Sequence, residues 1–169
     1  MTQITNTITG GVSQSLQAVH VDALADRFGS ALRFLNGQFD CKLSGRDTGG
    51  ALCIYDTIRS ARGGPPMHIH HEQDEWFYVR DGEFIVQVGD ARFHLGPGDA
   101  LLAPRKVPHA FANVSEKGRL IVAFQPAGSI ERLFSEIAEL SRFRLPTLED
   151  WQAVSCTKGV DIVGPPLKL

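Results

Sequence analysis

The sequence predicts an all-β protein in which many short strands form a sandwich or barrel, followed by a short helical tail. Two observations support this fold class. Between residues 31 and 126, runs rich in β-branched and aromatic residues recur at roughly 8–12-residue spacing and are separated by glycine, proline and aspartate. From residue 130 onward, the hydrophobic residues follow the spacing of a helix. This order is typical of a β-sandwich or β-barrel and not of βαβ units.

The length of 169 residues suits one domain of ~100–200 residues. We divide it into an N-terminal arm with the first strand or strands (1–38), a β-barrel (39–127) and a helical tail (128–169) that packs on the barrel or on a partner subunit. The first ~12 residues are rich in threonine, glycine, asparagine and serine, which predicts a frayed arm. The hydrophobic residues between positions 15 and 29 follow neither helical nor strand spacing, so no element is assigned there.

Nine runs are expected to be strands. They cover residues 31–43, 51–59, 66–70, 75–80, 83–88, 91–95, 99–104, 109–114 and 119–125. Asp81-Gly82 and Gly89-Asp90 are two-residue turn signals, and each predicts a hairpin between its flanking strands. The aromatic residues at 76–78 predict a strand that is buried on both faces.

Two helices are expected in the tail. Ser129 is a candidate N-cap for a helix over residues 130–143. A shorter helix is expected to begin at Thr147, with Asp150 completing a capping box, and to stop at Gly159. The Gly-Pro-Pro stretch that follows predicts extended backbone.

The composition excludes several classes of protein. A hydrophobic content of 43% with a formal net charge of −2 excludes intrinsic disorder and gives no electrostatic footprint for nucleic acid or an anionic membrane. No apolar run approaches the ~20 residues of a membrane span, and the first residues do not resemble a signal peptide. Cys41, Cys53 and Cys156 are odd in number and widely spaced, which predicts neither disulfides nor a cysteine metal site. The expectation is a soluble cytoplasmic protein.

Three histidines and one glutamate form a candidate metal site. His68 and His70 lie two residues apart on one predicted strand and therefore share a face. Glu75 shares that face only if residues 71–74 form a turn and a new strand begins at Glu75. His109 lies on a later strand. If these strands line one barrel, the four side chains converge and suit Fe, Mn, Ni, Cu, Co or Zn. On an octahedral ion, two positions then stay open.

Structural roles are the alternative for several of these residues. Paired histidines are common on surface strands, so His68 and His70 alone do not define a metal site. His20, His71 and His94 are expected to be exposed or hydrogen-bonded structural residues. Asn113, which shares a strand face with His109, is expected to bond the backbone.

The histidine segment resembles the first motif of the cupin family, G(X)5HXH(X)3–4E(X)6G. The spacing of His68, His70, Glu75 and Gly82 matches the motif, and Gly63 lies one step from its opening glycine. A second segment resembles the second motif, G(X)5PXG(X)2H(X)3N. Its matching residues are Gly98, Pro104, His109 and Asn113.

Lys106 departs from the second motif, because it stands where the family usually has glycine. This puts the local turn in doubt, since glycine is favoured at positive φ, but it leaves the ligands unchanged. The resemblance covers roughly residues 40–126, and the chain looks most like single-domain, quercetin-dioxygenase-like cupins. It implies a small cupin jelly-roll barrel with C-terminal helices, holding one divalent metal through His68, His70, Glu75 and His109. It also implies a homodimer.

Three functions are compatible with this resemblance. The first is a dioxygenase-type oxidoreductase acting on a small apolar or aromatic, flavonol- or diketone-like substrate, with Glu75 as general base. Phe77 and Phe111 would then line the substrate pocket, with Phe84 or Phe124 as a further wall. The second is a non-redox isomerase, decarboxylase or lyase. A phosphorylated substrate would need basic residues in the pocket, and strand parity does not place the nearby basic residues there: Arg59, Arg62, Arg105 and Lys106. The third is a small-molecule-binding protein without turnover.

Overall fold

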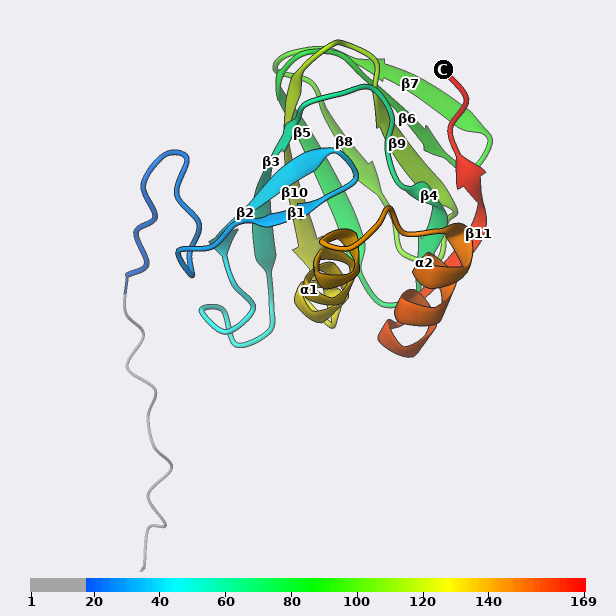
Figure 1. Ribbon diagram of the computed structural model, residues 1–169. Coiled ribbons are helices and arrows are strands. Elements are labelled where there is room, and N and C mark those ends of the chain that lie inside the picture. Colours follow the sequence, from blue (N-terminus) through cyan, green and yellow to red (C-terminus); the bar gives the residue numbers. More distant parts are fainter. Residues whose placement is uncertain (1–17) are drawn as a thin grey trace, which may run out of the picture.

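The computed structural model describes residues 18–169, so the arm expected over the first twelve residues lies outside the described part. Two antiparallel sheets pack against each other as a jelly-roll barrel (Figure 1). The six-stranded sheet has the order β1-β2-β3-β10-β5-β8, and the five-stranded sheet has the order β11-β4-β9-β6-β7.

The strands are β1 (Leu32–Phe34), β2 (Gly37–Leu43), β3 (Cys53–Arg59), β4 (Pro66–His70), β5 (Asp74–Asp81), β6 (Phe84–Val88), β7 (Ala91–Leu95), β8 (Ala100–Ala103), β9 (His109–Asn113), β10 (Gly118–Gln125) and β11 (Val160–Pro166). The helices are α1 (Ile130–Ser141) and α2 (Leu148–Ser155), followed by the 3-10 turn η1 (Cys156–Lys158).

Every predicted run contains a strand, which confirms the all-β fold. The first run divides into β1 and β2 because Leu35 and Asn36 both adopt positive φ, at 49° and 53°. Two successive residues of this kind form the tight turn that suits the twist of a hairpin. A turn lies where it was expected but is one residue shorter: it comprises residues 71–73, because β4 ends at His70 and β5 already begins at Asp74.

One of the two predicted hairpins is wrong. Gly89-Asp90 does join the paired strands β6 and β7, with Val88 opposite Ala91. Asp81-Gly82 instead carries the chain from β5 in the six-stranded sheet to β6 in the five-stranded sheet. The dipeptide signals the turn, in which Gly82 has a φ of 79°, but it does not determine which sheet the next strand joins.

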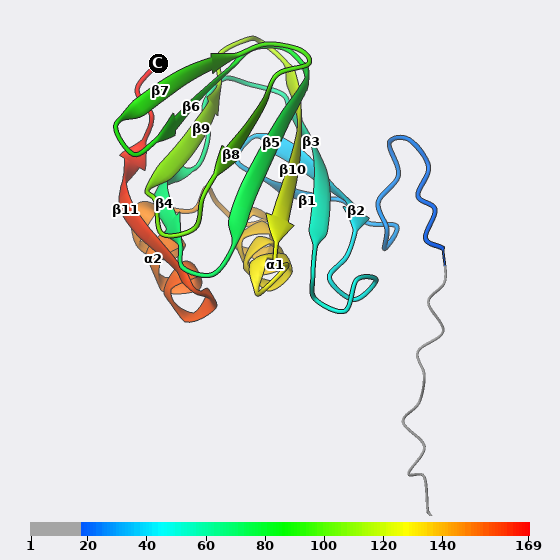
Figure 2. The same ribbon diagram turned by 180° about the vertical axis from the view of Figure 1, so that it is seen from behind.

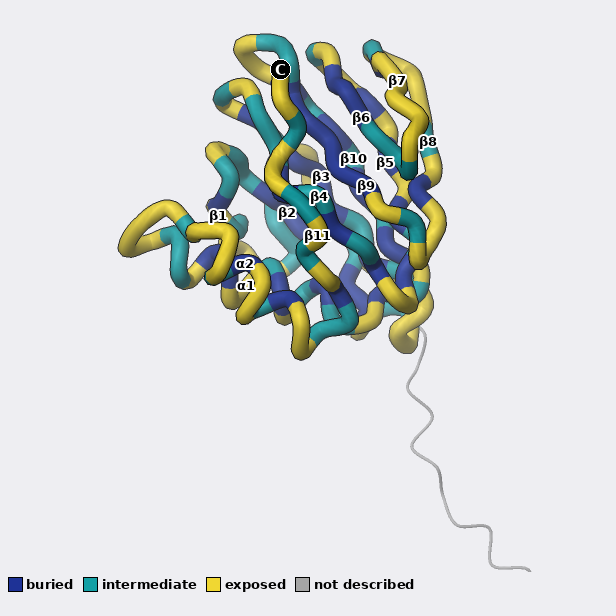
Figure 3. Tube along the Cα trace, turned by 90° about the vertical axis from the view of Figure 1, so that its right-hand side faces the viewer, coloured by how far each residue is buried: buried dark blue, intermediate teal, exposed yellow. Residues whose placement is uncertain are grey.

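The aromatic run on β5 is buried on one face only, contrary to the expectation. Phe77 is fully buried, whereas Trp76 and Tyr78 are 39% and 36% exposed. The exposed rings stack on each other with centroids 5.9 Å apart. The outer face of the six-stranded sheet is open to solvent here, so the strand alternates. In the five-stranded sheet, exposure differs between whole strands instead: β9 is buried along its length and β7 is mostly exposed (Figure 3).

The two helices lie together at one end of the barrel (Figures 1 and 2). Ser129 occupies the N-cap position of α1, but its hydroxyl accepts a hydrogen bond from Arg132 and caps nothing. The capping box of α2 is confirmed, with Thr147 and Asp150 bonding each other's backbone N–H groups. Gly159 ends the helical segment at a φ of 73°.

Helix α1 packs on the barrel of its own chain. Its Phe134 ring meets Phe39, Tyr55 and Phe124 edge-on, with centroids 5.1–5.7 Å apart. Ile137, one turn further along, is fully buried. Such edge-to-face contacts are a favoured arrangement for aromatic rings. The helix therefore closes the end of the barrel.

The last strand, β11, was expected only as extended backbone. It pairs antiparallel with β4, placing Val160 opposite His70 and Ile162 opposite His68. The chain thus returns from the helices to cover the edge of the five-stranded sheet beside the candidate ligands. None of the helices in the described part is long and apolar enough to cross a membrane.

The three cysteines differ in accessibility. All are free; Cys41 and Cys53 are buried, and Cys156 is exposed. Burial raises the pKa of Cys41 to about 12, so its thiol stays protonated and unreactive at neutral pH. We expect Ellman's reagent to titrate one thiol per native chain and three in denaturant. Rapid reaction of a second native thiol would contradict the packing around Cys41 and Cys53.

Candidate metal centre

The candidate ligands come from both sheets. His68 and His70 project from β4, and His109 from β9, all in the five-stranded sheet. Glu75 projects from β5 in the six-stranded sheet and reaches them across the barrel interior. Because side chains alternate along a strand, the one-residue interval on β4 places both imidazoles inside. On one continuous strand the side chain of Glu75 would point away from the two imidazoles. The turn between β4 and β5 reverses this, so that Glu75 faces the same interior, as expected.

The loop before β9 holds His109 beside β4. His109 lies directly opposite His68 in the sheet. Lys106 adopts a φ of 66°, so lysine occupies the conformation for which glycine is usual. This conformation costs a non-glycine residue on the order of 1 kcal/mol. The Lys106 N–H donates to the His70 carbonyl oxygen at 2.7 Å, which ties the loop to β4. The motif turn is therefore preserved.

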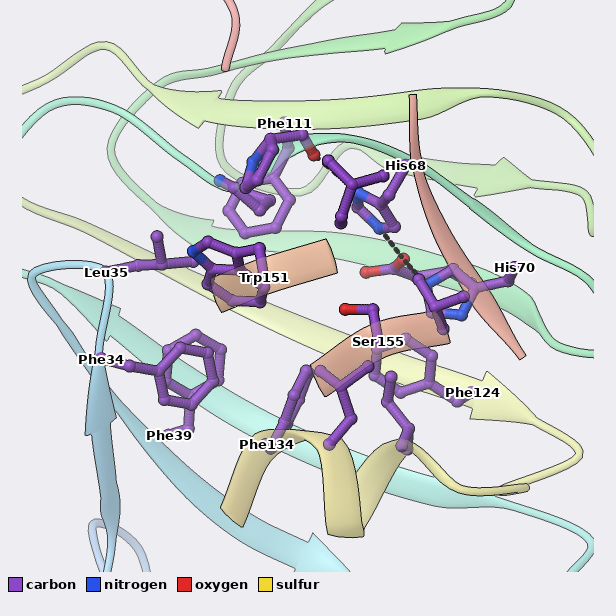
Figure 4. A pocket seen from close by; sticks show the side chains of 17 residues that line it. Phe34, Leu35, Phe39, His68, His70, Phe111, Phe124, Phe134, Trp151 and Ser155 are labelled. Atoms are coloured by element: carbon purple, nitrogen blue, oxygen red, sulfur yellow. Dashed lines mark hydrogen bonds and ion pairs between the residues drawn. The ribbon is translucent and has the colours of Figure 1, made fainter. Parts of the chain in front are cut away.

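The four ligand atoms surround one point. Glu75 Oε2 lies 3.0 Å from Nε2 of His109, 3.3 Å from that of His70 and 3.7 Å from that of His68. All the candidate ligand atoms lie within 4.8 Å of one another. Figure 4 shows His68 and His70 turned toward the same carboxylate.

Backbone carbonyls orient two of the imidazoles. His68 Nδ1 lies 2.8 Å from the Pro66 oxygen, and His109 Nδ1 lies 2.8 Å from the Val107 oxygen. A carbonyl oxygen only accepts, so each Nδ1 carries a hydrogen and donates it. This leaves Nε2 as the atom that faces the cluster and can bind a metal, an arrangement common among metal-ligating histidines.

The site is buried and electrostatically biased toward a cation. The four residues are at most 8% exposed. Burial raises the pKa of Glu75. Its contacts with the three imidazoles lower the pKa by more than burial raises it, so the net pKa lies well below the ordinary value. Burial lowers the pKa of His68 to about 4. At neutral pH an ionised carboxylate and a neutral His68 are the forms that bind metals.

The geometry fits a transition metal. Metal–ligand bonds of ~2.0–2.2 Å place adjacent donor atoms about 2.8–3.6 Å apart, with octahedral coordination at the short end and tetrahedral coordination at the long end. The three Nε2–Oε2 distances of 3.0, 3.3 and 3.7 Å are close to that range. Three imidazole nitrogens and one carboxylate oxygen suit a borderline divalent ion. The cluster is therefore able to hold one metal.

An apolar cavity opens beside His68, His70 and Glu75. Its free volume is about 40 Å³, room for a few water-sized groups. Phe111 and Phe124 line it from the barrel, and the helices contribute Phe134 and Trp151 (Figure 4). The described residues that line it include no lysine or arginine.

The predicted pocket residues are divided between the cavity wall and the layer behind it. Phe111 lines the cavity, as does Phe124, the further candidate. Phe77 is fully buried and lies behind Phe111, with ring centroids 5.6 Å apart. Phe84 lies behind Phe111 as well, at 6.4 Å. Trp151 was not anticipated, because its helical pattern carries no signal for the surface on which it packs.

The structural alternatives hold for the remaining histidines and for Asn113. His71 is exposed and contacts Asp161 at 2.8 Å, and His20 and His94 are exposed. Asn113 is fully buried and donates from Nδ2 to the backbone oxygens of Ala61 and Ser115, at 3.0 and 2.9 Å.

The nearby basic residues do not enter the cavity. Arg105 forms two hydrogen bonds with the Asp74 carboxylate, at 3.0 and 2.8 Å. Arg59 is buried between the rings of Phe39 and Phe111 but is not among the lining residues. The cavity therefore offers no cationic side chain to a phosphorylated ligand.

Comparison with known proteins agrees with this architecture. Residues 57–124 match the family model described as Cupin domain. Quercetin 2,3-dioxygenase of Bacillus subtilis is 28% identical over 113 residues, which are 66% of this chain and 33% of that protein. The alignment thus spans only a third of that relative.

Solved structures show the same fold. KdgF from Halomonas sp. superposes with a TM-score of 0.52 at 19% identity, covering 63% of this chain and 94% of the other. An RmlC-like cupin from Shewanella frigidimarina gives a TM-score of 0.50 at 24% identity, covering 58% and 84%. The two-sheet barrel, the motif spacing and the family model over residues 57–124 all agree, so the chain has a cupin fold that contains one cupin domain.

Proposed function

We propose that this cupin is a metal-dependent, dioxygenase-type oxidoreductase that acts on a small, largely apolar substrate with neighbouring oxygens, such as a diketone. The observation that carries the proposal is the position of the three-histidine, one-glutamate cluster at the wall of an aromatic cavity. The similarity to a protein named for quercetin dioxygenation supports the reaction type.

His68, His70, Glu75 and His109 would hold one divalent ion. The bound ion supplies Lewis acidity, with positions left open by the four protein ligands. Glu75 has a second role in this proposal. Its ionised carboxylate can accept the proton of a substrate hydroxyl at a carboxylate oxygen, which requires hydrogen-bond reach.

The cavity walls favour a small substrate. Pockets for drug-sized ligands commonly have volumes of ~300–1,000 Å³, whereas this cavity has about 40 Å³. A flavonol would enter only if helix side chains moved, so a diketone is the better fit. Phe111, Phe124 and Trp151 would exclude water and orient the apolar part of the ligand.

Oxygen dependence tests the proposal. Protein reconstituted separately with Fe(II), Mn(II), Ni(II) or Cu(II) is supplied with pentane-2,4-dione or quercetin in air and under argon. We expect substrate loss and oxygen uptake in equal amounts with at least one metal, and no turnover under argon. The His70→Ala variant should be inactive and His71→Ala active.

Two outcomes would favour the other functions. Equal substrate loss with and without oxygen would indicate a non-redox isomerase, decarboxylase or lyase that uses the same ligands to polarise a carbonyl. Tight binding without turnover of either compound would indicate a binding protein.

A further inference from the structure

Ser155 carries the only hydroxyl among the described residues that line the cavity. It is the last residue of α2 and is fully buried. Its Oγ has no hydrogen-bond partner in the described part of the chain. A buried hydroxyl without a partner is unfavourable, because folding removes its hydrogen bonds to water and replaces them with nothing.

The other helical serines show how this cost is normally avoided. Ser135 and Ser141 on α1 each donate to the carbonyl oxygen four residues earlier, at 2.9 and 2.7 Å. Ser155 stands in the same relation to Trp151, but the structure contains no such bond. In Figure 4 its hydroxyl oxygen instead projects into the space between Trp151 and His70.

The helix holds this hydroxyl at a defined place. Trp151 and Ser155 are one turn apart and line the cavity together, so they share the inner face of α2. The Thr147–Asp150 capping box fixes the start of the helix. Groups on such supported elements are positioned more accurately than groups on loops.

We propose that Ser155 is a positioning residue. Its hydroxyl would form a hydrogen bond with one oxygen of a substrate that lies in the cavity against the metal cluster. This inference rests on the proposed function. A hydroxyl both donates and accepts, so it suits a carbonyl, enolate or hydroxyl oxygen. The substrate class is therefore a small molecule with two neighbouring oxygens on an apolar frame.

Binding to a metal-loaded protein tests this inference without turnover. Cobalt(II)-reconstituted protein is titrated with pentane-2,4-dione under argon, and binding is followed by the visible absorption of cobalt. We expect Ser155→Ala to weaken binding roughly tenfold, as for loss of one hydrogen bond. Cobalt content and melting temperature should not fall, because the variant removes an unpaired polar group. The matched control is Ser141→Ala, which removes a hydroxyl outside the cavity and should bind like the wild type.

The outcomes separate the two proposals. Equal affinity of the wild type and Ser155→Ala would overturn the role of Ser155 and leave the proposed function standing. Loss of cobalt or of thermal stability in Ser155→Ala would also overturn it, because the hydroxyl would then serve the metal site or the fold. Failure of the wild type to bind pentane-2,4-dione would overturn the proposed substrate class and the inference together.

Discussion

Alanine at His70 or at His109 is expected to remove the metal from the protein. Each imidazole supplies one of four donors to a site that is buried and preorganised by the barrel. Loss of a group that merely orients a ligand commonly weakens metal affinity 10–100-fold, so loss of the ligand itself should exceed ~100-fold. Elemental analysis after dialysis against a weak chelator should find near one ion per chain in the wild type and a small fraction in either variant.

His71→Ala is the matched control, because His71 follows a ligand directly but is exposed and contacts Asp161. It should retain the wild-type metal content. Full metal occupancy in both His70→Ala and His109→Ala would refute the ligand assignment.

Replacing Gly64 with alanine is expected to destabilise the barrel severely. A Cβ at this position would lie 1.8 Å from the Phe111 carbonyl oxygen and 3.1 Å from the Ala112 Cα. Both atoms belong to the backbone of β9. The steric clash with the added Cβ can therefore be removed only if β9 moves away from the segment that leads into β4. We expect a loss of about 3 kcal/mol or more in the free energy of unfolding, measured with urea. Metal affinity should fall with it, because β9 carries His109.

Gly96→Ala provides the comparison, since its added Cβ would meet only Asp99 Oδ2, at 3.9 Å. Its effect should stay within about 0.5 kcal/mol. Similar stabilities for Gly64→Ala and Gly96→Ala would show that the close approach of Gly64 to β9 is absent in solution.

The candidate ligands could be predicted because strand periodicity is local information. The intervals between His68, His70 and Glu75 determine which faces these side chains occupy, once the turn between the two strands is recognised. His109 could be included only on the condition that its strand lines the same barrel, since no local pattern pairs it with β4, and the motif resemblance supported that condition. The strands themselves were predictable for the same reason, as turn residues and β-branched runs lie close together in the chain.

The closure of the cavity was not predictable from the sequence. Trp151 and Ser155 belong to a helix whose pattern indicates an apolar face but not the surface that receives it. Asp81-Gly82 similarly signals a turn without specifying a sheet. In both cases the outcome depends on packing between segments far apart in the chain, for which hydrophobic spacing contains no signal.

The pairing of β11 with β4 has a consequence for the order of folding. β4 contacts β9 in register at a single residue pair, and its main partner is β11, roughly 95 residues later. Until residues 160–166 dock, the strand that carries His68 and His70 has an unpaired edge. We therefore expect the four candidate ligands to reach their final arrangement late in folding, after β11 has paired with β4. Loss of β11 would expose an edge of β4 that can pair with another chain, and a bound metal would favour the docked state.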